Sequence, residues 1–311
     1  MLQKPMDVLE HFPVRKSRKQ KQAFLRETQE YLSGLGYSPV VEKGSFGARN
    51  LVIGDPEKAK YLITAHYDTC AWLPFPNFIT PCSFLPFLIY QVLLLVLIFG
   101  VAMGVGVAVR LLTDVPEFSG TAAYIAICLM TLLMLVGPAN RHNANDNTSG
   151  VVTVLDIARH MPQNLREKVC FVLFDLEEAG LIGSASYRSK HKKASEKQLI
   201  LNLDCVGEGD TLLFFPTAKL KKEPEKLSWL ANHCGNYGKK NLKLHKKGFG
   251  YYPSDQANFP GGVGICALCH NRLLGYYLGK IHTGRDRVLD ETNVNILRAC
   301  LISMVGSDAA E

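Results

Sequence analysis

The 311-residue chain contains 47% hydrophobic residues and carries a formal net charge of +7. This apolar share is enough for a substantial core, so it excludes a disordered chain, and the length allows one large α/β domain or two small ones. Basic residues gather in short runs at 15–19 and 239–247, without any nucleic-acid-binding motif. We interpret these runs first as solvated faces and second as contacts to anionic lipid headgroups, so nucleic acid is not an expected partner.

The cysteines give no sign of a disulfide framework, because they are scattered and odd in number, nine in all. Cys266 and Cys269 have C-x-x-C spacing, but they belong to an apolar run and no second cysteine pair accompanies them. A buried strand is the main interpretation, with a redox or metal pair as the alternative. The basic first thirty residues contain no apolar segment typical of a cleavable signal peptide.

The first predicted element is an amphipathic helix over 17–36, where apolar residues recur at near-helical spacing up to Gly34 and Gly36. A second helix is predicted over 149–160, with Ser149 as its N-cap. Short segments rich in β-forming residues lie at 50–53, 61–65, 169–174, 199–203 and 263–268. Strands that alternate with helices predict an α/β layered fold with a largely parallel central sheet.

Two uncharged stretches interrupt this alternation. The first, 84–109, is about 26 residues long and can cross a hydrocarbon core of about 30 Å as a tilted helix. The second, 120–137, is shorter, and the polar loop 110–119 separates the two. We therefore expect an integral membrane protein with two transmembrane helices and the lipid bilayer as a partner. The alternative is a helical hairpin buried inside a soluble protein.

Small residues recur within both predicted membrane helices. Gly100 and Gly104 form a G-x-x-x-G motif, and Ala122 and Ala126 have the same spacing. This pattern favours close helix packing, and it leaves open a helix–helix dimer through Gly100 and Gly104. Alternatively, these glycines are simply tolerated in a membrane helix.

Acids and histidines follow the predicted strands. His66 and Asp68 come after 61–65, the pair Glu177 and Glu178 after 169–174, and Asp204 after 199–203. Ligands of α/β sheets collect outside the carboxyl ends of the strands. Asp146, just before the second helix, and His282 are expected to complete the same cluster.

The composition of this cluster predicts a two-metal centre. Five of its members are ligand types that zinc prefers: His66, Asp146, Glu178, Asp204 and His282. They hold two ions only if one carboxylate bridges. Glu177, adjacent to a ligand, is the predicted general base. Asp68 is predicted to accept the second imidazole N–H of His66 and thereby orient the ring.

These residues lie in blocks that resemble the co-catalytic di-zinc aminopeptidases of metallopeptidase family twenty-eight. The blocks are 65–69, 144–150, 177–184, 202–204, 254–255 with Phe259, and 282–283 with Asp286. By this resemblance Asp146 bridges two zinc ions, His66 and Asp204 complete one site, and Glu178 and His282 complete the other. The resemblance also implies a three-layer α/β/α sandwich around a mixed, largely parallel sheet of about eight strands.

The resemblance further implies a substrate pocket at Ser254, Asp255 and Gln256, where Gln256 stands in place of a frequent histidine. It implies a discontinuous catalytic domain, 1–70 and 144–311, with 71–143 as the insertion. The basic N-terminal segment and Arg141, against the single Arg110 of the loop, predict that this domain is cytoplasmic.

The expected function is a zinc-dependent exopeptidase, most simply an aminopeptidase that cleaves N-terminal peptide bonds with a metal-activated water at the membrane surface. The position of the insertion beside the metal-site residues leads us to expect amphipathic or membrane-derived substrates. The alternatives are a hydrolase of N-acyl amino acids or lipidated peptides, a glutaminyl cyclase, and a non-catalytic membrane scaffold. A scaffold role is not favoured, because all five ligands are present.

Overall fold

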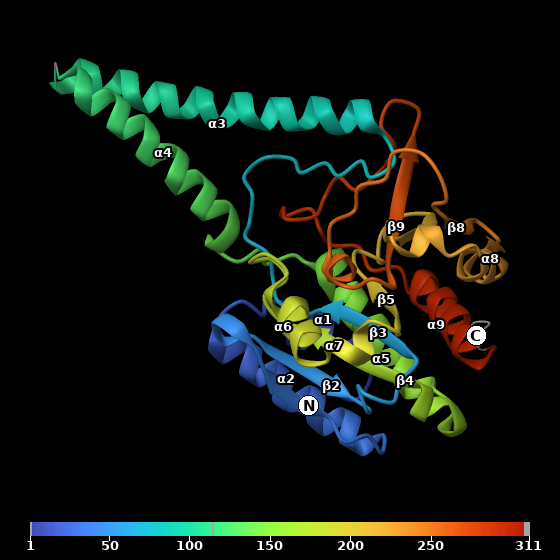
Figure 1. Cartoon of the computed structure of the whole chain (residues 1–311). Helices are drawn as coiled ribbons and strands as arrows, with labels where there is room; N and C mark the ends of the chain where they lie inside the picture. The colour runs from blue at the N-terminus through green and yellow to red at the C-terminus, as the bar shows by residue number, and fades with distance from the viewer. Residues whose placement is uncertain (1, 114, 308–311) are drawn as a thin grey trace.

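The computed structural model describes residues 2–113 and 115–307, which form a mixed β-sheet enclosed by helices, with a long helical hairpin projecting from it (Figure 1). The strand order is β1-β2-β4-β3-β5-β9-β6-β8-β7, and β10 pairs with β9. The four central strands are mutually parallel: β4 (Val169–Phe174), β3 (Tyr61–His66), β5 (Leu199–Leu203) and β9 (Gly262–Asn271). The outer strands are β1 (Val40–Lys43), β2 (Arg49–Ile53), β6 (Thr211–Pro216), β7 (Gly235–Tyr237), β8 (Lys240–Leu244) and β10 (Gly275–Tyr277).

The predicted α/β fold with a mixed sheet and flanking helices is confirmed. Parallel pairing dominates only at the centre, because β1, β2, β6, β7 and β10 each join a neighbour in antiparallel fashion. The described residues form ten strands rather than about eight. All five predicted strands are present, as β2, β3, β4, β5 and β9. Five strands were missed. The outer strands β1, β7, β8 and β10 are short and half-exposed and lack a continuous apolar run, whereas β6 is a fully buried apolar run that was overlooked.

The helices cover both faces of the sheet. Apolar side chains of α2 (Arg18–Gly34), α5 (Gly150–His160), α8 (Pro224–Asn232) and α9 (Glu291–Gly306) share one core with alternate strand residues such as Ile63. The intervening residues, such as Leu62, face a second core that includes Tyr187 of α6 (Ile182–Lys190). This alternation is the two-residue period of a strand buried on both faces. The shorter helices are α1 (Asp7–His11), α7 (Lys192–Ser195), η1 (Ser45–Gly47), η3 (Gln163–Lys168), η4 (Leu220–Lys222) and η5 (Asp255–Asn258).

Two predicted helix starts have different outcomes. Ser17, the first residue of the helix predicted over 17–36, caps α2 in a full capping box with Gln20. Ser149 does not cap α5: it already has helical dihedral angles, and its hydroxyl donates to the carbonyl of Asn145 at 2.6 Å. Instead Asn147 Oδ1 accepts the Gly150 N–H at 3.0 Å. A π-helical turn, Ala144–Ser149, places this amide two residues upstream of the predicted cap.

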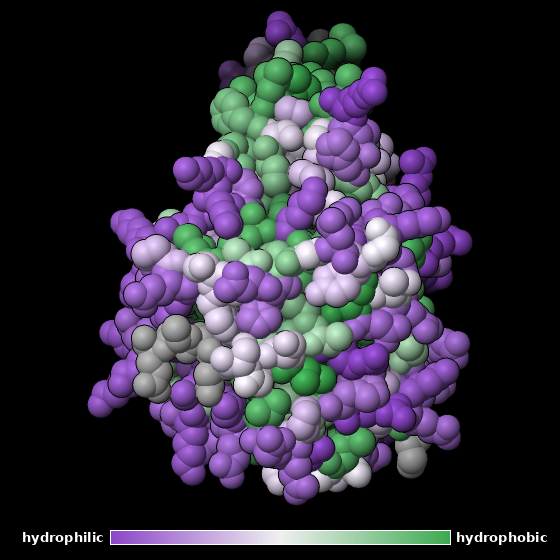
Figure 2. Space-filling view, turned by 90° about the vertical axis from the view of Figure 1, so that its right-hand side faces the viewer, coloured by the Kyte–Doolittle hydropathy of each residue, from purple (hydrophilic) through white to green (hydrophobic). Residues whose placement is uncertain are grey.

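The projecting hairpin consists of α3 (Phe84–Thr113) and α4 (Pro116–Val136), both long and apolar enough to cross a membrane. Their side chains are mostly exposed, which argues against a hairpin buried within a soluble core. Hydrophobic residues accordingly gather over the narrow upper part of the molecule (Figure 2). Helix α3 begins where predicted, but the expected polar loop 110–119 is mostly helical: Leu111 and Leu112 extend α3, and Pro116 starts α4.

Within the hairpin, the helices approach through Gly106 rather than Gly100 and Gly104. A Cβ added at Gly106 would lie 3.0 Å from the carbonyl oxygen of Ser119 and 3.3 Å from Ala123 Cβ. At Gly100 and Gly104 no described atom lies within 4 Å of such a Cβ. The predicted intrachain packing through these two glycines is therefore wrong, because they face away from α4. The dimer through them stays a prediction.

Candidate metal centre

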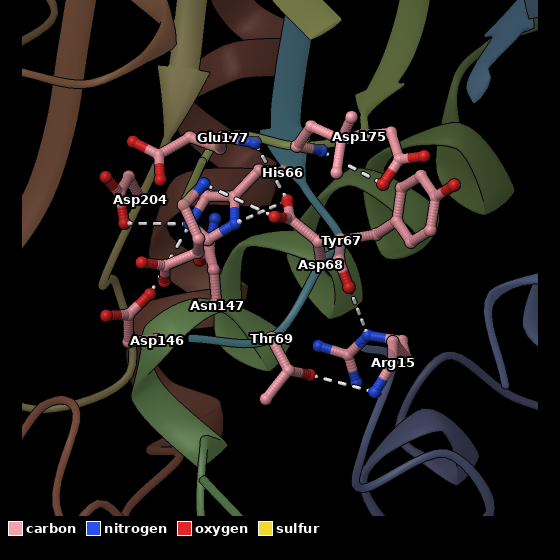
Figure 3. Close-up of polar contacts among 12 residues, drawn as sticks. Arg15, His66, Tyr67, Asp68, Thr69, Asp146, Asn147, Asp175, Glu177 and Asp204 are labelled. Carbon is pink, nitrogen blue, oxygen red and sulfur yellow. Dashed lines mark hydrogen bonds and ion pairs between the residues drawn. The ribbon is translucent and has the colours of Figure 1, made fainter. Parts of the chain in front are cut away.

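The predicted ligands meet at the carboxyl ends of the central parallel strands (Figure 3). His66 is the last residue of β3, Asp204 follows β5, and Glu177 and Glu178 lie just beyond β4. Asp146 lies in the turn before α5, and His282 lies after β10. Because β3, β4 and β5 are parallel neighbours, their ends fall at one edge, where the sequence places the acids and histidines.

Asp146 lies between the two histidines, with one oxygen toward each. Its Oδ1 is 3.4 Å from His66 Nε2, and its Oδ2 is 3.0 Å from His282 Nε2. His66 Nε2 is also 3.7 Å from Asp204 Oδ1, and His282 Nε2 is 3.6 Å from Glu178 Oε2. The structure thus groups His66 with Asp204 and His282 with Glu178, and Asp146 belongs to both groups.

Two observations indicate that these residues are suited to bind metal ions. Two ligand atoms that bind one tetrahedral zinc ion are roughly 3.3–3.5 Å apart. Three of the four distances between the histidine nitrogens and the carboxylate oxygens, 3.4, 3.6 and 3.7 Å, are close to this separation and longer than a good hydrogen bond. Asp204 Oδ1 is buried and has no hydrogen-bond partner among the described residues. A buried carboxylate oxygen without a partner is costly unless a cation completes its surroundings. His66, Glu177 and Asp204 form one group of ligand atoms within 4.8 Å, and Asp146, Glu178 and His282 belong to another.

The acids determine the charge of both histidines in the absence of a metal. Burial opposes protonation, but Glu178 and Asp146 outweigh it and raise the pKa of His282 to about 9. Burial likewise opposes protonation of His66, while Glu177 and the neighbouring aspartates raise its pKa well above the usual value. Burial raises the pKa of Glu178 to about 8. The cluster is rich in acids. Without a metal, protons on Glu178 and His282 offset its negative charge, which bound metal ions would otherwise neutralise.

Asp68 connects the two sides of the site. Its carboxylate accepts the backbone N–H groups of Glu177 at 3.1 Å and Glu178 at 3.3 Å. Its Oδ1 also lies 3.5 Å from His66 Nδ1, too far for a good hydrogen bond. Asp68 therefore fixes the segment that carries the predicted base, and it lies beside the histidine that it is predicted to orient.

Glu177 lies at the open side of the cluster, where its segment is only half-buried. Burial of its carboxyl group raises its pKa well above the usual value, against the pull of His66. A carboxylate that favours its protonated form can receive a proton from a reacting water.

Asp286 holds the backbone at Asp146. Its two carboxylate oxygens accept the N–H groups of Asn145 at 2.7 Å and Asp146 at 2.9 Å. Asp286 is fully buried, and burial raises its pKa to about 7. Asp286 belongs to one of the resembling blocks, but no role was predicted for it, because nothing in the sequence links it to a residue 141 positions earlier.

The first basic run, 15–19, was predicted to be a solvated face, and this is wrong for Arg15, which is buried. Its side chain is wholly buried, and its Nε donates to the Tyr67 carbonyl at 2.6 Å (Figure 3). A terminal nitrogen donates to Thr148 Oγ1 at 3.1 Å. Burial lowers its pKa to about 10, against the opposing effect of Asp68. The guanidinium remains a cation behind an acidic site. Lys21, further along, is also buried and pairs with Asp175.

Two free thiols adjoin the ligand set, and neither was predicted there. Cys70 Sγ lies within 4.8 Å of ligand atoms of Asp146, Glu178 and His282, and Cys205 lies within the same distance of Asp146 and Asp204. Both thiols are buried, which raises their pKa well above the usual value. Cys205 directly follows a predicted ligand, and Cys70 comes two residues after Asp68, so proximity along the chain was the available signal.

Left-handed backbone conformations occur at three positions of the site. Leu176, Cys205 and His282 have φ angles of 55°, 56° and 60°. His282 is a candidate ligand, Cys205 follows the candidate ligand Asp204, and Leu176 precedes the predicted base Glu177. Such conformations cost about 1 kcal/mol for residues other than glycine and persist where surrounding contacts enforce them.

Ser254, Asp255 and Gln256 lie under the cluster. Asn202 donates to Ser254 Oγ at 3.0 Å and to Gln256 Oε1 at 2.9 Å, and both side chains are buried. Asp255 is fully buried, and neither of its carboxylate oxygens has a hydrogen-bond partner of ordinary geometry in the described part of the chain. Burial raises its pKa to about 7, against the pull of His66. Their predicted contact with substrate stays a prediction.

The sequence matches the model of peptidase family M28 over residues 131–299, more than half of the chain. The chain belongs to peptidase family M28. The match includes Asp146, Glu177, Glu178, Asp204 and His282, and it begins after His66 and Asp68. No curated protein sequence matches the chain.

Solved structures share the M28 fold at low identity. The LapA aminopeptidase of Legionella pneumophila is 15% identical, with 99% of this chain and 69% of that chain covered, at a TM-score of 0.58. A glutaminyl cyclase of Porphyromonas gingivalis is 18% identical, with 95% and 93% covered, also at 0.58. A Zn-dependent exopeptidase from Parabacteroides distasonis is 15% identical, with 94% and 92% covered, at 0.53. At these identities the likeness shows the fold alone.

Proposed function

We propose that this M28 protein is a zinc-dependent exopeptidase of the aminopeptidase type that holds two zinc ions. The observation that carries this proposal is the placement of Asp146, whose two oxygens face His66 and His282 separately. A single carboxylate between two groups of ligands suits two neighbouring ions. His66 and Asp204 would hold one ion, and Glu178 and His282 the other. Zinc at these positions would polarise the substrate carbonyl and lower the pKa of water.

The protein's own groups would move the proton. Glu177 takes it from the attacking water and returns it to the leaving amine, since its carboxylate lies beside the ligand atoms of His66 and Asp204. Asp68 holds Glu177 in place through the backbone N–H of that residue. Asp286 holds Asp146 in the same way.

We infer that α3 and α4 anchor the enzyme in a bilayer, with the catalytic domain (1–70 and 144–311) on the cytoplasmic side. Their length, composition and exposure support this inference. At the base of α3, the rings of Phe84 and Phe87 pack on Phe249, with centroids 5.3 and 5.6 Å apart. The exposed Lys246 and Lys247 lie three and two residues before Phe249, as suits a surface that faces anionic headgroups.

Glutaminyl cyclase is the second candidate, because several solved structures with this fold carry that name. The two activities differ in their products. A peptidase releases a free amino acid from an aminoacyl peptide, whereas a cyclase releases ammonia from an N-terminal glutamine.

The deciding experiment combines metal analysis with a substrate panel on the detergent-solubilised protein. The panel contains aminoacyl peptides, N-acyl amino acids and a glutaminyl peptide. We expect Glu177→Gln to retain two zinc ions and to lose activity by about 10²–10⁴-fold, because only the base is removed. Asp146→Ala should lose metal. Full activity of Glu177→Gln would refute the assigned role, and ammonia as the only product would favour the cyclase.

A further inference from the structure

A cavity of about 420 Å³ lies between the two hairpin helices and the segment 72–76, which we call the strap. Helices α3 and α4 meet at their far ends and diverge toward the body of the protein (Figure 1). Leu97 and Val101 of α3 and Met130 and Met134 of α4 line this space. Leu73 and Phe75 of the strap close its third side. We call this cavity the apolar slot.

The strap ties the apolar slot to the metal centre. The Trp72 N–H donates to the Pro138 carbonyl at 2.8 Å, and the Leu73 N–H donates to the carbonyl of His282 at 2.8 Å. A second cavity, of about 300 Å³, shares residues 72–75 with the slot and is also lined by Thr283 and Arg285. An apolar space and a polar space therefore meet at the strap, directly beside a candidate metal ligand.

The lining determines the kind of occupant. Apart from the indole N–H of Trp72, the side chains around the apolar slot offer no hydrogen-bonding or charged group, so an aliphatic chain fits it best. The methionines add flexible side chains that adapt to such a chain. The adjoining cavity, with Thr283 and Arg285, suits the polar part of the same molecule.

We propose that the apolar slot binds the aliphatic tail of an amphipathic substrate, such as an acylated amino acid or peptide, and so places its amide at the metal centre. This inference rests on the proposed function. Because each buried methylene strengthens binding by about fourfold, a tail that fills the slot raises kcat/KM mainly by lowering KM.

A matched pair of variants on α3 tests the slot. Val101→Phe fills it, whereas Val96→Phe adds the same bulk at an exposed position that does not line it. Each protein is assayed in detergent with a short substrate and with the same substrate carrying a dodecyl tail. We expect Val101→Phe to lower kcat/KM for the tailed substrate by about tenfold, through KM, and to leave the short substrate unchanged. Val96→Phe should change neither.

A binding measurement separates this proposal from the proposed function. Trp72 lines the slot, so a dodecanoyl-glycine probe with a brominated tail should quench its fluorescence in the full-length protein, and less so in Val101→Phe. Equal quenching in Val101→Phe and Val96→Phe would refute tail binding in the apolar slot, even if the enzyme hydrolyses peptides. A tail preference that persists unchanged in Val101→Phe would also overturn it, since the tail would then act only by partitioning. Weaker quenching in Val101→Phe than in Val96→Phe, without hydrolysis of any substrate, would support tail binding in the apolar slot and refute the proposed exopeptidase activity.

Discussion

Asp146 is the residue on which the two candidate metal groups depend, because its carboxylate is the part that they share. Its position is fixed by a buried neighbour from a distant segment, since Asp286 binds the N–H groups of Asn145 and Asp146. Arg15 places a buried cation nearby. The roles of the ligands therefore depend on residues that bind no metal in the proposed site.

Replacement of Asp286 should weaken metal binding without removing a ligand. Asp286→Asn replaces one acceptor oxygen by an N–H₂ group that faces a backbone N–H. We expect zinc affinity to fall by about 10–100-fold, while the fully loaded enzyme keeps most of its activity. Competition with a chromogenic chelator measures the affinity. Asp156→Asn, which alters the ion pair with Arg298 on α5 and α9, is the control. Equal affinities of the two variants would contradict the positioning role.

Zinc uptake should release protons at about pH 7.5. The metal-free protein holds protons on groups of raised pKa, His282 at about 9 and Glu178 at about 8, and a bound ion displaces them. Protons are bound below these pKa values and lost above them, so we expect release of more than one proton per protein, declining as the pH rises past about 9. Calorimetry in buffers of different ionisation enthalpy measures this number. A binding heat independent of the buffer would contradict it.

Among the elements, the hairpin differs most from the rest of the protein. Helix α3 packs on α4 through Gly106, while its base packs on Phe249 of the catalytic body. The remaining faces are apolar and exposed. The hairpin is thus fixed at its two ends and leaves the apolar slot between them.

Substitution of Gly106 should separate the two helices. In Gly106→Leu the new Cβ alone meets Ser119 and Ala123 within 3.3 Å, so we expect a loss of about 1–3 kcal/mol from overpacking. Thermal unfolding in detergent measures the change. Gly120→Leu is the matched control, because no described atom lies within 4 Å of a Cβ at Gly120. Similar stability of both variants would show that the helices do not pack closely at Gly106.

For the whole molecule, the arrangement of charge predicts the orientation in the membrane. The exposed Lys246 and Lys247 lie near the base of α3, and Arg141 follows α4, whereas Arg110 and Glu117 lie near the far end of the hairpin. By the positive-inside rule we expect the C-terminus in the cytoplasm and the 110–119 segment on the opposite side. Reporters fused at these two positions measure the orientation. An exported C-terminal reporter would reverse it.

The sequence by itself determined the four central strands and the neighbouring β2, the two apolar helices and the seven residues expected at the metal centre. Each of these depends on local signals: apolar runs have characteristic lengths, and side chains that follow parallel strands meet at one edge. Only the tertiary structure decided that Arg15 is buried, that Asp286 holds Asp146, that Asn147 rather than Ser149 caps α5, and that Gly106 faces α4. These features join residues that are distant in the chain, or depend on how a turn or helix is rotated. Burial and direction are properties of the packed chain, which a one-dimensional pattern does not specify.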